Sequence, residues 1–150
     1  MLKILNKIPR EVGVAVSGGP DSMAILDFLR NNHDVTACYF DHGTDFGKKC
    51  KRFVKNYCDN NNIPLVIGIK SKVIPYNNKN VIRPFVSTSK RSLEDWCIRK
   101  EVPFLTDPAN ADRKFMRSII RHDIMPHARL VNPGMEKTFK KLVEKEYNNI

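Results

Sequence analysis

Short apolar runs alternate with amphipathic stretches along the first half of the chain. Residues 12–16, 35–40 and 65–69 are brief, mostly apolar runs of the kind typical of buried strands. Between them, residues 21–29 and 48–59 place apolar side chains at helical spacing, and the expected inward-facing ones are Met23, Leu26 and Phe28, then Phe53, Val54 and Tyr57. This alternation predicts an α/β fold, a parallel sheet with flanking helices.

Polar residues at the ends of these runs predict the boundaries of the elements. Asp21 and Ser22 are expected to cap the first helix, and Asn31 with Asn32 to end it. The sequence at 41–43, Asp-His-Gly, is expected to stop the second strand, and the asparagines at 60–62 form a turn before the third.

The second half of the chain is predicted to be mostly helical. A polar stretch, 71–80, is expected to form a loop that separates a first part, 1–80, from a second part, 81–150, which completes the same domain. In that second part, the pattern predicts an extended segment at 81–85, a helix from Ser89 to about 100, a loop at 106–110, and a helix over 115–124 that Pro126 stops. A last helix follows 132–134, and its apolar face is expected to pack: Met135, Phe139, Leu142 and Val143.

Composition adds a strong positive charge to this picture. The 150 residues include 26 Lys and Arg against 16 Asp and Glu, a formal net charge of +10. Such a surface favours polyanions such as nucleic acid, and a lysine-rich solvated face is an equally good explanation from charge alone. No apolar run approaches a membrane span and the first residues lack a signal-peptide pattern, so a cytoplasmic location is expected. The four cysteines form no C-x-x-C pair and are expected to be free thiols.

The main candidate for chemistry is the segment from Ser17 to Ser22, which joins the first strand to the first helix. Gly18 and Gly19 allow a tight turn and a close approach of the backbone to a ligand. The N–H groups at the start of a helix attract an anion, and Ser17 and Ser22 add hydroxyl donors. Pro20 follows the glycines, and the Walker ending G-K-[ST] is absent. The alternative is a glycine-rich turn with a capping aspartate.

Asp21 is unusual inside an anion site. A carboxylate repels phosphate unless a cation lies between them, so Asp21 predicts a bound Mg²⁺.

Those six residues, Ser17-Gly18-Gly19-Pro20-Asp21-Ser22, resemble the pyrophosphate loop of the N-type ATP pyrophosphatases. That superfamily includes GMP synthetase, asparagine synthetase, argininosuccinate synthetase, tRNA thiolation enzymes and tRNA(Ile)-lysidine synthase. The resemblance implies the fold of that superfamily, ATP and Mg²⁺ as cofactors, and Ser17 to Ser22 as the residues that bind ATP.

Several short motifs resemble tRNA(Ile)-lysidine synthase in particular. They run in the same order as in that family: residues 40–43, 82–85, 96–97, 102–104, 107–112, 115–117, 120–122, Pro126 and 132–134. The resemblance implies a cytoplasmic ligase that acts on a tRNA(Ile) with a CAU anticodon. The wobble cytosine O2 would be adenylated by ATP, and the ε-amine of lysine would then displace AMP to form lysidine.

The resemblance also implies roles for residues outside the loop. Asp21, Arg117 and Arg121 are expected to act in catalysis, with Asp21 as the metal ligand. Arg83, Arg117, Arg121 and His122 are expected to contact phosphates of ATP or tRNA. A solvated basic face is the alternative for the two arginines on the 115–124 helix, and Arg83 is equally well explained as a surface residue.

The chain departs from that family in one stretch. The family has more chain between its third strand and the Arg-Pro segment, and no His-His-x-Asp-Asp sequence occurs here. The family's C-terminal tRNA-binding domains are absent from this sequence as well. Asp41, Asp45 and Asp107 are candidates to replace the missing acids. Two rivals therefore stay open: a binding protein of this family without catalysis, and another enzyme of the superfamily, such as a tRNA thiolase, although paired cysteines are lacking.

Overall fold

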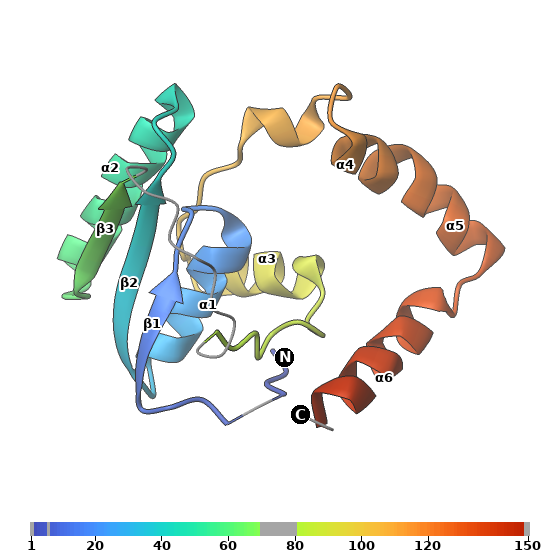
Figure 1. Cartoon of the computed structure of the whole chain (residues 1–150), viewed down its shortest axis with the longest axis horizontal. Coiled ribbons are helices and arrows are strands. Elements are labelled where there is room, and N and C mark those ends of the chain that lie inside the picture. Colours follow the sequence, from blue (N-terminus) through green and yellow to red (C-terminus); the bar gives the residue numbers. More distant parts are fainter. Residues whose placement is uncertain (1, 6, 70–80, 149–150) are drawn as a thin grey trace. The chain divides into compact units, whose positions relative to one another are not determined.

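The computed structural model describes residues 2–5, 7–69 and 81–148 (Figure 1). They form two compact units, Met1–Leu105 and Thr106–Ile150. The loop predicted at 71–80, and with it the expected boundary at residue 80, lies outside the described residues. The observed division falls later in the chain, because the helix that follows residue 89 packs in the first unit.

The first unit contains a parallel sheet of three strands. They are β1 (Glu11–Ala15), β2 (Asp34–Asp41) and β3 (Leu65–Ile69), in the spatial order β1-β2-β3. Both neighbouring pairs run parallel, with Ala15 beside Cys38 and Cys38 beside Val66. The predicted α/β class and all three strands are confirmed, with ends shifted by one residue in β1 and β2.

Three helices accompany the sheet: α1 (Pro20–Arg30), α2 (Asp45–Asn60) and α3 (Lys90–Arg99). The expected capping of α1 by Asp21 and Ser22 is wrong. The N-cap of α1 is Gly19, which has no capping side chain, and Pro20 occupies the first turn, where its missing N–H costs no helical hydrogen bond. Thr44 caps α2, and Ser89 caps α3 as predicted, by accepting a hydrogen bond from Ser92 N.

The helices that connect the strands cover one face of the sheet. The chain moves from β1 to β2 to β3 in one direction, and right-handed crossovers therefore place α1 and α2 on the same side. Burial agrees, because Val14, Val35 and Ala37 are buried on that side. On the opposite side, Phe40 is 45% exposed and Val66 58% exposed.

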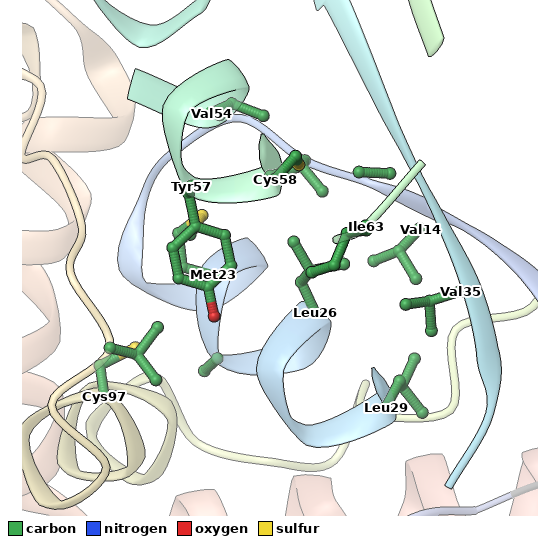
Figure 2. Packing of buried hydrophobic residues seen from close by; sticks show 14 of the residues in the cluster. Val14, Met23, Leu26, Leu29, Val35, Val54, Tyr57, Cys58, Ile63 and Cys97 are labelled. Carbon is green, nitrogen blue, oxygen red and sulfur yellow. The ribbon is translucent and has the colours of Figure 1, made fainter. Parts of the chain in front are cut away.

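The hydrophobic core lies between the covered face of the sheet and the helices (Figure 2). Met23 and Leu26 of α1 are fully buried, as are Val54 and Cys58 of α2. Cys97 of α3 is 1% exposed, and Cys50 is also buried, so three of the four free thiols are core residues while Cys38 is exposed. For α1 and α2, Met23, Leu26, Val54 and Tyr57 are buried as the spacing of apolar residues predicted, while Phe28 and Phe53 are partly buried.

The segment before α3 is not extended throughout. Residues 84–87 form a turn, in which Val86 N donates to Arg83 O (3.1 Å) and Thr88 N donates to Phe85 O (2.9 Å). The turn directs Phe85 inward, where its ring meets Phe28 edge to face at 5.5 Å between centroids. The gain from burying this ring explains why the predicted extended conformation is lost at Pro84 and Phe85.

The second unit is helical. It comprises a 3₁₀ turn η2 (Pro108–Ala111), α4 (Met116–Ile119), a π-helical segment η3 (Ile120–Ile124), α5 (Met125–Val131) and α6 (Met135–Asn148). The predicted stop at Pro126 is wrong, because the helix continues through it. The wider π turn ends just before Pro126, so the proline occupies the first turn of a new α-helical run, where it needs no N–H acceptor.

The apolar face of α6 is not packed as expected. Phe139 is 60% exposed and Leu142 53% exposed, and among the described residues of this unit Ser118 alone is buried. Within residues 2–5, 7–69 and 81–148, no helix has the length and apolar character needed to cross a membrane.

Candidate functional site

The loop of residues 17–22, hereafter the 17–22 loop, leaves the carboxyl end of β1 and enters α1. Gly18 has φ of +85°, a conformation that side chains of L-residues rarely adopt, and Gly19 is extended with φ of −78° and ψ of 164°. This turn presents the first N–H groups of α1 at the carboxyl edge of the sheet, which is where parallel sheets bind ligands.

The two serines of the loop are joined by a hydrogen-bond network. Ser22 Oγ donates to Gly19 O (3.0 Å) and accepts from Ser17 N (3.1 Å). Because its single proton goes to Gly19, the Ser17 hydroxyl is the donor in the 3.2 Å contact between the two hydroxyls. Ser17 Oγ also accepts from Gly19 N (3.4 Å). The network joins both ends of the turn, and both hydroxyls can rotate to donate to an anion.

The two glycines serve different purposes. A Cβ at Gly18 would point at α2, 3.4 Å from Phe53 Cδ1 and 3.5 Å from Val54 Cγ2. A Cβ at Gly19 would meet nothing closer than Ser17 Oγ, at 3.6 Å. Gly18 is therefore needed by its backbone conformation and by packing against α2, whereas the chain itself leaves room for a side chain at Gly19. The expectation of a close ligand approach applies to Gly19 alone.

Segments from the far end of the first unit brace this loop. Leu105 N donates to Gly18 O (2.8 Å), and the thiol of Cys97 in α3 donates to Pro20 O (3.4 Å). Burial raises the pKa of Cys97 to about 11, with Asp27 as a further cause, so this thiol stays protonated at neutral pH and keeps its role as donor. Contacts from α2, α3 and residue 105 thus make the loop a rigid feature of the fold.

A buried carboxylate ties the three helices together. Asp27, which is 5% exposed, accepts from Arg30 Nε (2.9 Å), Trp96 Nε1 (2.9 Å) and, more weakly, Tyr57 OH (3.4 Å). These donors come from α1, α3 and α2. Sequence reasoning missed Asp27, although a charged residue beside Met23 and Leu26 on an apolar helical face was the available signal. Trp96 packs on Phe28 in this cluster and is a core residue, as expected.

The end of β2 lies one strand away from the 17–22 loop in the same sheet. Asp41 accepts from Gly43 N (2.9 Å) and pairs with Lys51 of α2 (3.2 Å). The Gly43 hydrogen bond, then the Lys51 contact, lower the pKa of Asp41. His42 is exposed, and its ring lies edge to face on Phe40 with centroids 5.0 Å apart.

The remaining predicted site residues lie on the surface. Arg83 is exposed before the 84–87 turn of the first unit. Arg117 of α4, Arg121 and His122 of η3 are exposed in the second unit, and His122 Nε2 lies 3.3 Å from Asn110 O. The loop and these three residues therefore belong to different units of the chain.

The candidate metal ligands do not form a cluster. Among the described residues, no group of three or more His, Cys, Asp or Glu side chains could hold a metal ion. The proposed substitutes have other partners: Asp41 binds Lys51, Asp45 pairs with Lys48 (2.9 Å), and Asp107 caps η2 through Ala109 N (2.9 Å). Asp21 is exposed at the start of α1, within the loop that would hold a phosphate.

Comparison with known proteins identifies the family to which the chain belongs. The family model described as PP-loop domain matches residues 1–73 and 66–128. A tRNA(Ile)-lysidine synthase of Thermotoga sp. (strain RQ2) is 25% identical over 199 aligned positions, which cover 87% of this chain and 48% of that protein. Proteins of the same name from Thermosipho africanus (strain TCF52B) and Borreliella burgdorferi (strain ZS7) are 34% and 31% identical, over 45% and 47% of this chain and 16% of each relative.

The chain spans about half or less of the length of these relatives. The Thermotoga alignment has 199 positions and covers 87% of the 150 residues of this chain, which is about 130 residues. About 70 positions of that relative therefore have no counterpart in this chain. The two stretches that match the family model meet at residues 66–73, directly around the end of β3. The matched region includes β1, the 17–22 loop and α1, and the chain belongs to the PP-loop domain family.

Proposed function

We propose that the 17–22 loop binds the triphosphate of ATP. The observation that carries this proposal is a hydrogen-bonded turn that presents helix N–H groups and two serine hydroxyls, in a chain of the PP-loop domain family. Gly19 leaves space for the backbone to meet a phosphate. The net charge of +10 adds a long-range attraction for ATP and for nucleic acid.

We propose further that the protein uses ATP to modify a tRNA, as the names of its relatives suggest. The specific reaction is lysidine formation on a tRNA(Ile) with a CAU anticodon. The cytosine O2 attacks the α-phosphorus of ATP, and the bond to pyrophosphate breaks. The ε-amine of lysine then attacks C2, the C2–O2 bond breaks, and AMP leaves with that oxygen.

The residues of the loop would act mainly on the phosphates. N–H groups of the first turn of α1, with the Ser17 and Ser22 hydroxyls, would neutralise charge on the departing pyrophosphate. Asp21 fits a Mg²⁺ held jointly with phosphate oxygens, because the anion site otherwise repels its carboxylate. Such an ion would supply additional charge neutralisation. Arg117, Arg121, His122 and Arg83 are proposed contacts to tRNA or ATP phosphates.

A second candidate function is binding without catalysis. Two observations favour it. About 70 positions of the Thermotoga relative have no counterpart in this chain, and the described residues include no group of three or more His, Cys, Asp or Glu side chains that could hold a metal ion. In that case ATP or tRNA would bind, with no lysine transferred.

One experiment separates these functions. The chain is incubated with ATP, lysine and a tRNA(Ile) transcript that has a CAU anticodon, and the anticodon nucleosides are analysed by mass. Lysidine in the wild type that disappears in Asp21→Asn, with tRNA affinity kept, supports the catalytic proposal. Asp34→Asn is the matched control, because it removes an exposed acid from the opposite end of the sheet and should leave activity unchanged.

Equal inactivity of wild type and Asp21→Asn, with intact ATP and tRNA binding, would support the binding function instead. Lysidine formation that persists undiminished in Asp21→Asn would refute the assignment of Asp21 as the metal ligand.

A further inference from the structure

Helix α2 (Figure 1) has an outward face that is rich in positive charge. Its inner residues, among them Val54 and Cys58, are buried in the core, and four cations are exposed on its outer side. These cations are Lys48, Lys49, Arg52 and Lys55. Residues three and four apart on a helix are neighbours about 5–6 Å apart, so the four side chains form one patch, hereafter the α2 basic face. The patch extends along about 10 Å of the helix.

Only one cation of the α2 basic face is neutralised by a described acid. Lys48 pairs with Asp45 in the first turn of the helix (2.9 Å). Among the described residues, no ion pair or hydrogen bond involves the side chains of Lys49, Arg52 and Lys55. The other acid of α2, Asp59, follows Lys55 by four residues, which is the less favourable order for a helical ion pair. Three cations on one side of one helix are therefore available to a ligand.

The positions of these cations do not stabilise the helix. The helix dipole favours cations in the last turn, and Arg30 of α1 and Arg99 of α3 lie there. The last turn of α2 has no basic residue, and its cations lie before that turn. Arg52 follows Lys48 by four residues and precedes Lys55 by three, and like charges at these spacings destabilise a helix. Helix α2 forms because its inner face is buried, so the stability of the fold does not explain the α2 basic face.

The shape and chemistry of the α2 basic face fit a chain of phosphates. A helix that binds a membrane surface inserts exposed apolar side chains among the lipids. In α2, every large apolar side chain belongs to the core or packs against it, so the helix offers lipids nothing to insert. Cations spread over about 10 Å of helix are too far apart to converge on one small anion, but they can follow a nucleic-acid backbone.

We propose that the α2 basic face binds the backbone of RNA, with Lys49, Arg52 and Lys55 in contact with its phosphates. This inference rests on the proposed role of tRNA as a partner, and it adds a surface in the first unit to the contacts proposed for Arg117 and Arg121. Phosphate contacts carry no information about bases, so the face holds RNA irrespective of sequence.

The same helix contacts the 17–22 loop on its other side. A Cβ at Gly18 would lie 3.4 Å from Phe53 Cδ1, and Phe53 packs against the core. RNA held on the α2 basic face therefore does not occupy the space at the 17–22 loop. ATP and RNA can bind to the first unit at the same time.

Removal of charge with a matched control tests the proposal in the full chain. The test variant combines Lys49→Gln, Arg52→Gln and Lys55→Gln. The control variant changes three exposed residues of the first unit outside α2, and it combines Lys7→Gln, Arg91→Gln and Arg99→Gln. Both variants lose three positive charges, so the long-range attraction for RNA falls equally in both. Filter binding of the tRNA(Ile) transcript at several salt concentrations gives the affinities.

The test variant should bind the transcript about 30-fold more weakly than wild type at moderate salt, because three phosphate contacts are lost. Its slope of log affinity against log salt should fall by about two to three, while the control variant should stay within about threefold of wild type. A second tRNA with another anticodon should show the same loss of affinity. The free energy of unfolding should not fall in the test variant, because repulsion within α2 is removed.

Acetylation of the wild-type protein gives a measurement that needs no variant. Bound tRNA should slow acetylation of Lys49 and Lys55, detected by mass spectrometry, and should leave the rate at Lys7 unchanged. If Lys49 and Lys55 react equally fast with and without tRNA, the proposal is wrong, and this holds even if the test variant fails to fold.

Equal tRNA affinity in the test and control variants would overturn this inference and leave the proposed function intact. The inference would also fail if the test variant lost binding to phosphatidylserine vesicles but kept its tRNA affinity, since α2 would then meet a membrane. A wild-type chain that binds no tRNA would overturn both this inference and the proposal that tRNA is the substrate. ATP affinity should be the same in the two triple variants, so the 17–22 loop is tested separately.

Discussion

The two units of this protein use their apolar residues in opposite ways. Every residue of the hydrophobic core lies between Leu2 and Val102, in the first unit. In the described part of the second unit, Ser118 alone is buried, and large apolar side chains are exposed, among them Met116, Leu130, Val131 and Phe139. The first unit buries its apolar side chains in a core of its own, whereas most large apolar side chains in the described part of the second unit are exposed.

This difference bears on function. A buried core and an inter-helix network around Asp27 support the 17–22 loop, so the proposed binding of an anion would require little ordering of the chain. In the described part of the second unit, the arginines, the histidines and most large apolar side chains are exposed. We therefore expect changes in the core of the first unit to affect stability and ATP together, and changes in the second to affect tRNA binding alone.

The largest effects are expected at the two glycines of the loop. Gly18→Val and Gly19→Val should both abolish detectable ATP binding in a calorimetric titration. Gly18→Val should also destabilise the fold by at least about 2 kcal/mol, because of its positive φ and its contact with Phe53. Gly19→Val should cost at most about 1 kcal/mol, the preference for glycine at an N-cap. Gly13→Ala, outside the loop, is the control that should keep ATP affinity. Unchanged ATP affinity in Gly19→Val would show that the loop is not the phosphate site.

The second prediction compares an ion pair from each unit. Asp27→Ala should lower the free energy of unfolding by about 3 kcal/mol in urea unfolding. This loss is smaller than the loss expected for a fully buried ion pair, because the Arg30 side chain is 34% exposed. Asp123→Ala removes the half-exposed pair with Arg113 (3.2 Å) in the second unit and should change the main transition by less than about 0.5 kcal/mol. Similar effects of the two substitutions would contradict the contrast drawn between the units.

The third prediction concerns nucleic acid. Arg117→Ala and Arg121→Ala should each weaken tRNA binding about threefold to tenfold at moderate salt, because each removes one phosphate contact. The slope of log affinity against log salt should fall by about one for each variant, and thermal stability should not change, since both side chains are exposed. Filter binding at several salt concentrations measures this. An affinity that does not depend on salt would argue against tRNA as the partner.

The smallest effect is expected at Tyr57. Burial is the main cause that raises the pKa of Tyr57 to about 12, and the charge of Arg30 offsets part of this rise. In the unfolded chain the same phenol titrates near 10. The phenol is thus harder to ionise in the folded state, and its contribution to stability is complete below pH 10 and lost as pH rises toward 12. Tyr57→Phe should cost less than about 1 kcal/mol at neutral pH, because its hydrogen bond to Asp27 is long at 3.4 Å.

The measurement is urea unfolding of Tyr57→Phe and wild type from pH 8 to about pH 12. The decline in wild-type stability above pH 10 should be shallower in the variant. An identical decline in both proteins would show that Tyr57 does not carry this pH dependence.

Most elements of the first unit could be predicted from local pattern. Alternating apolar runs located β1, β2 and β3, and Ser89 was predicted as a helix cap from its residue type. The errors arose where tertiary packing overrode local preference. Burial of Phe85 turned a segment expected to be extended, and a π-helical turn allowed Pro126 to remain within a helix.

By itself, the sequence determined the α/β class, the position of the 17–22 loop between a strand and a helix, and the membership of the loop in a recognisable pattern. Those features depend on residues that are adjacent in the chain, whose spacing and backbone freedom can be read directly. Only the tertiary structure decided that Gly18 is required by packing against α2 and that Asp27 joins three helices. Each of these depends on segments far apart in sequence, whose contacts arise when the core forms and are not encoded in any local pattern.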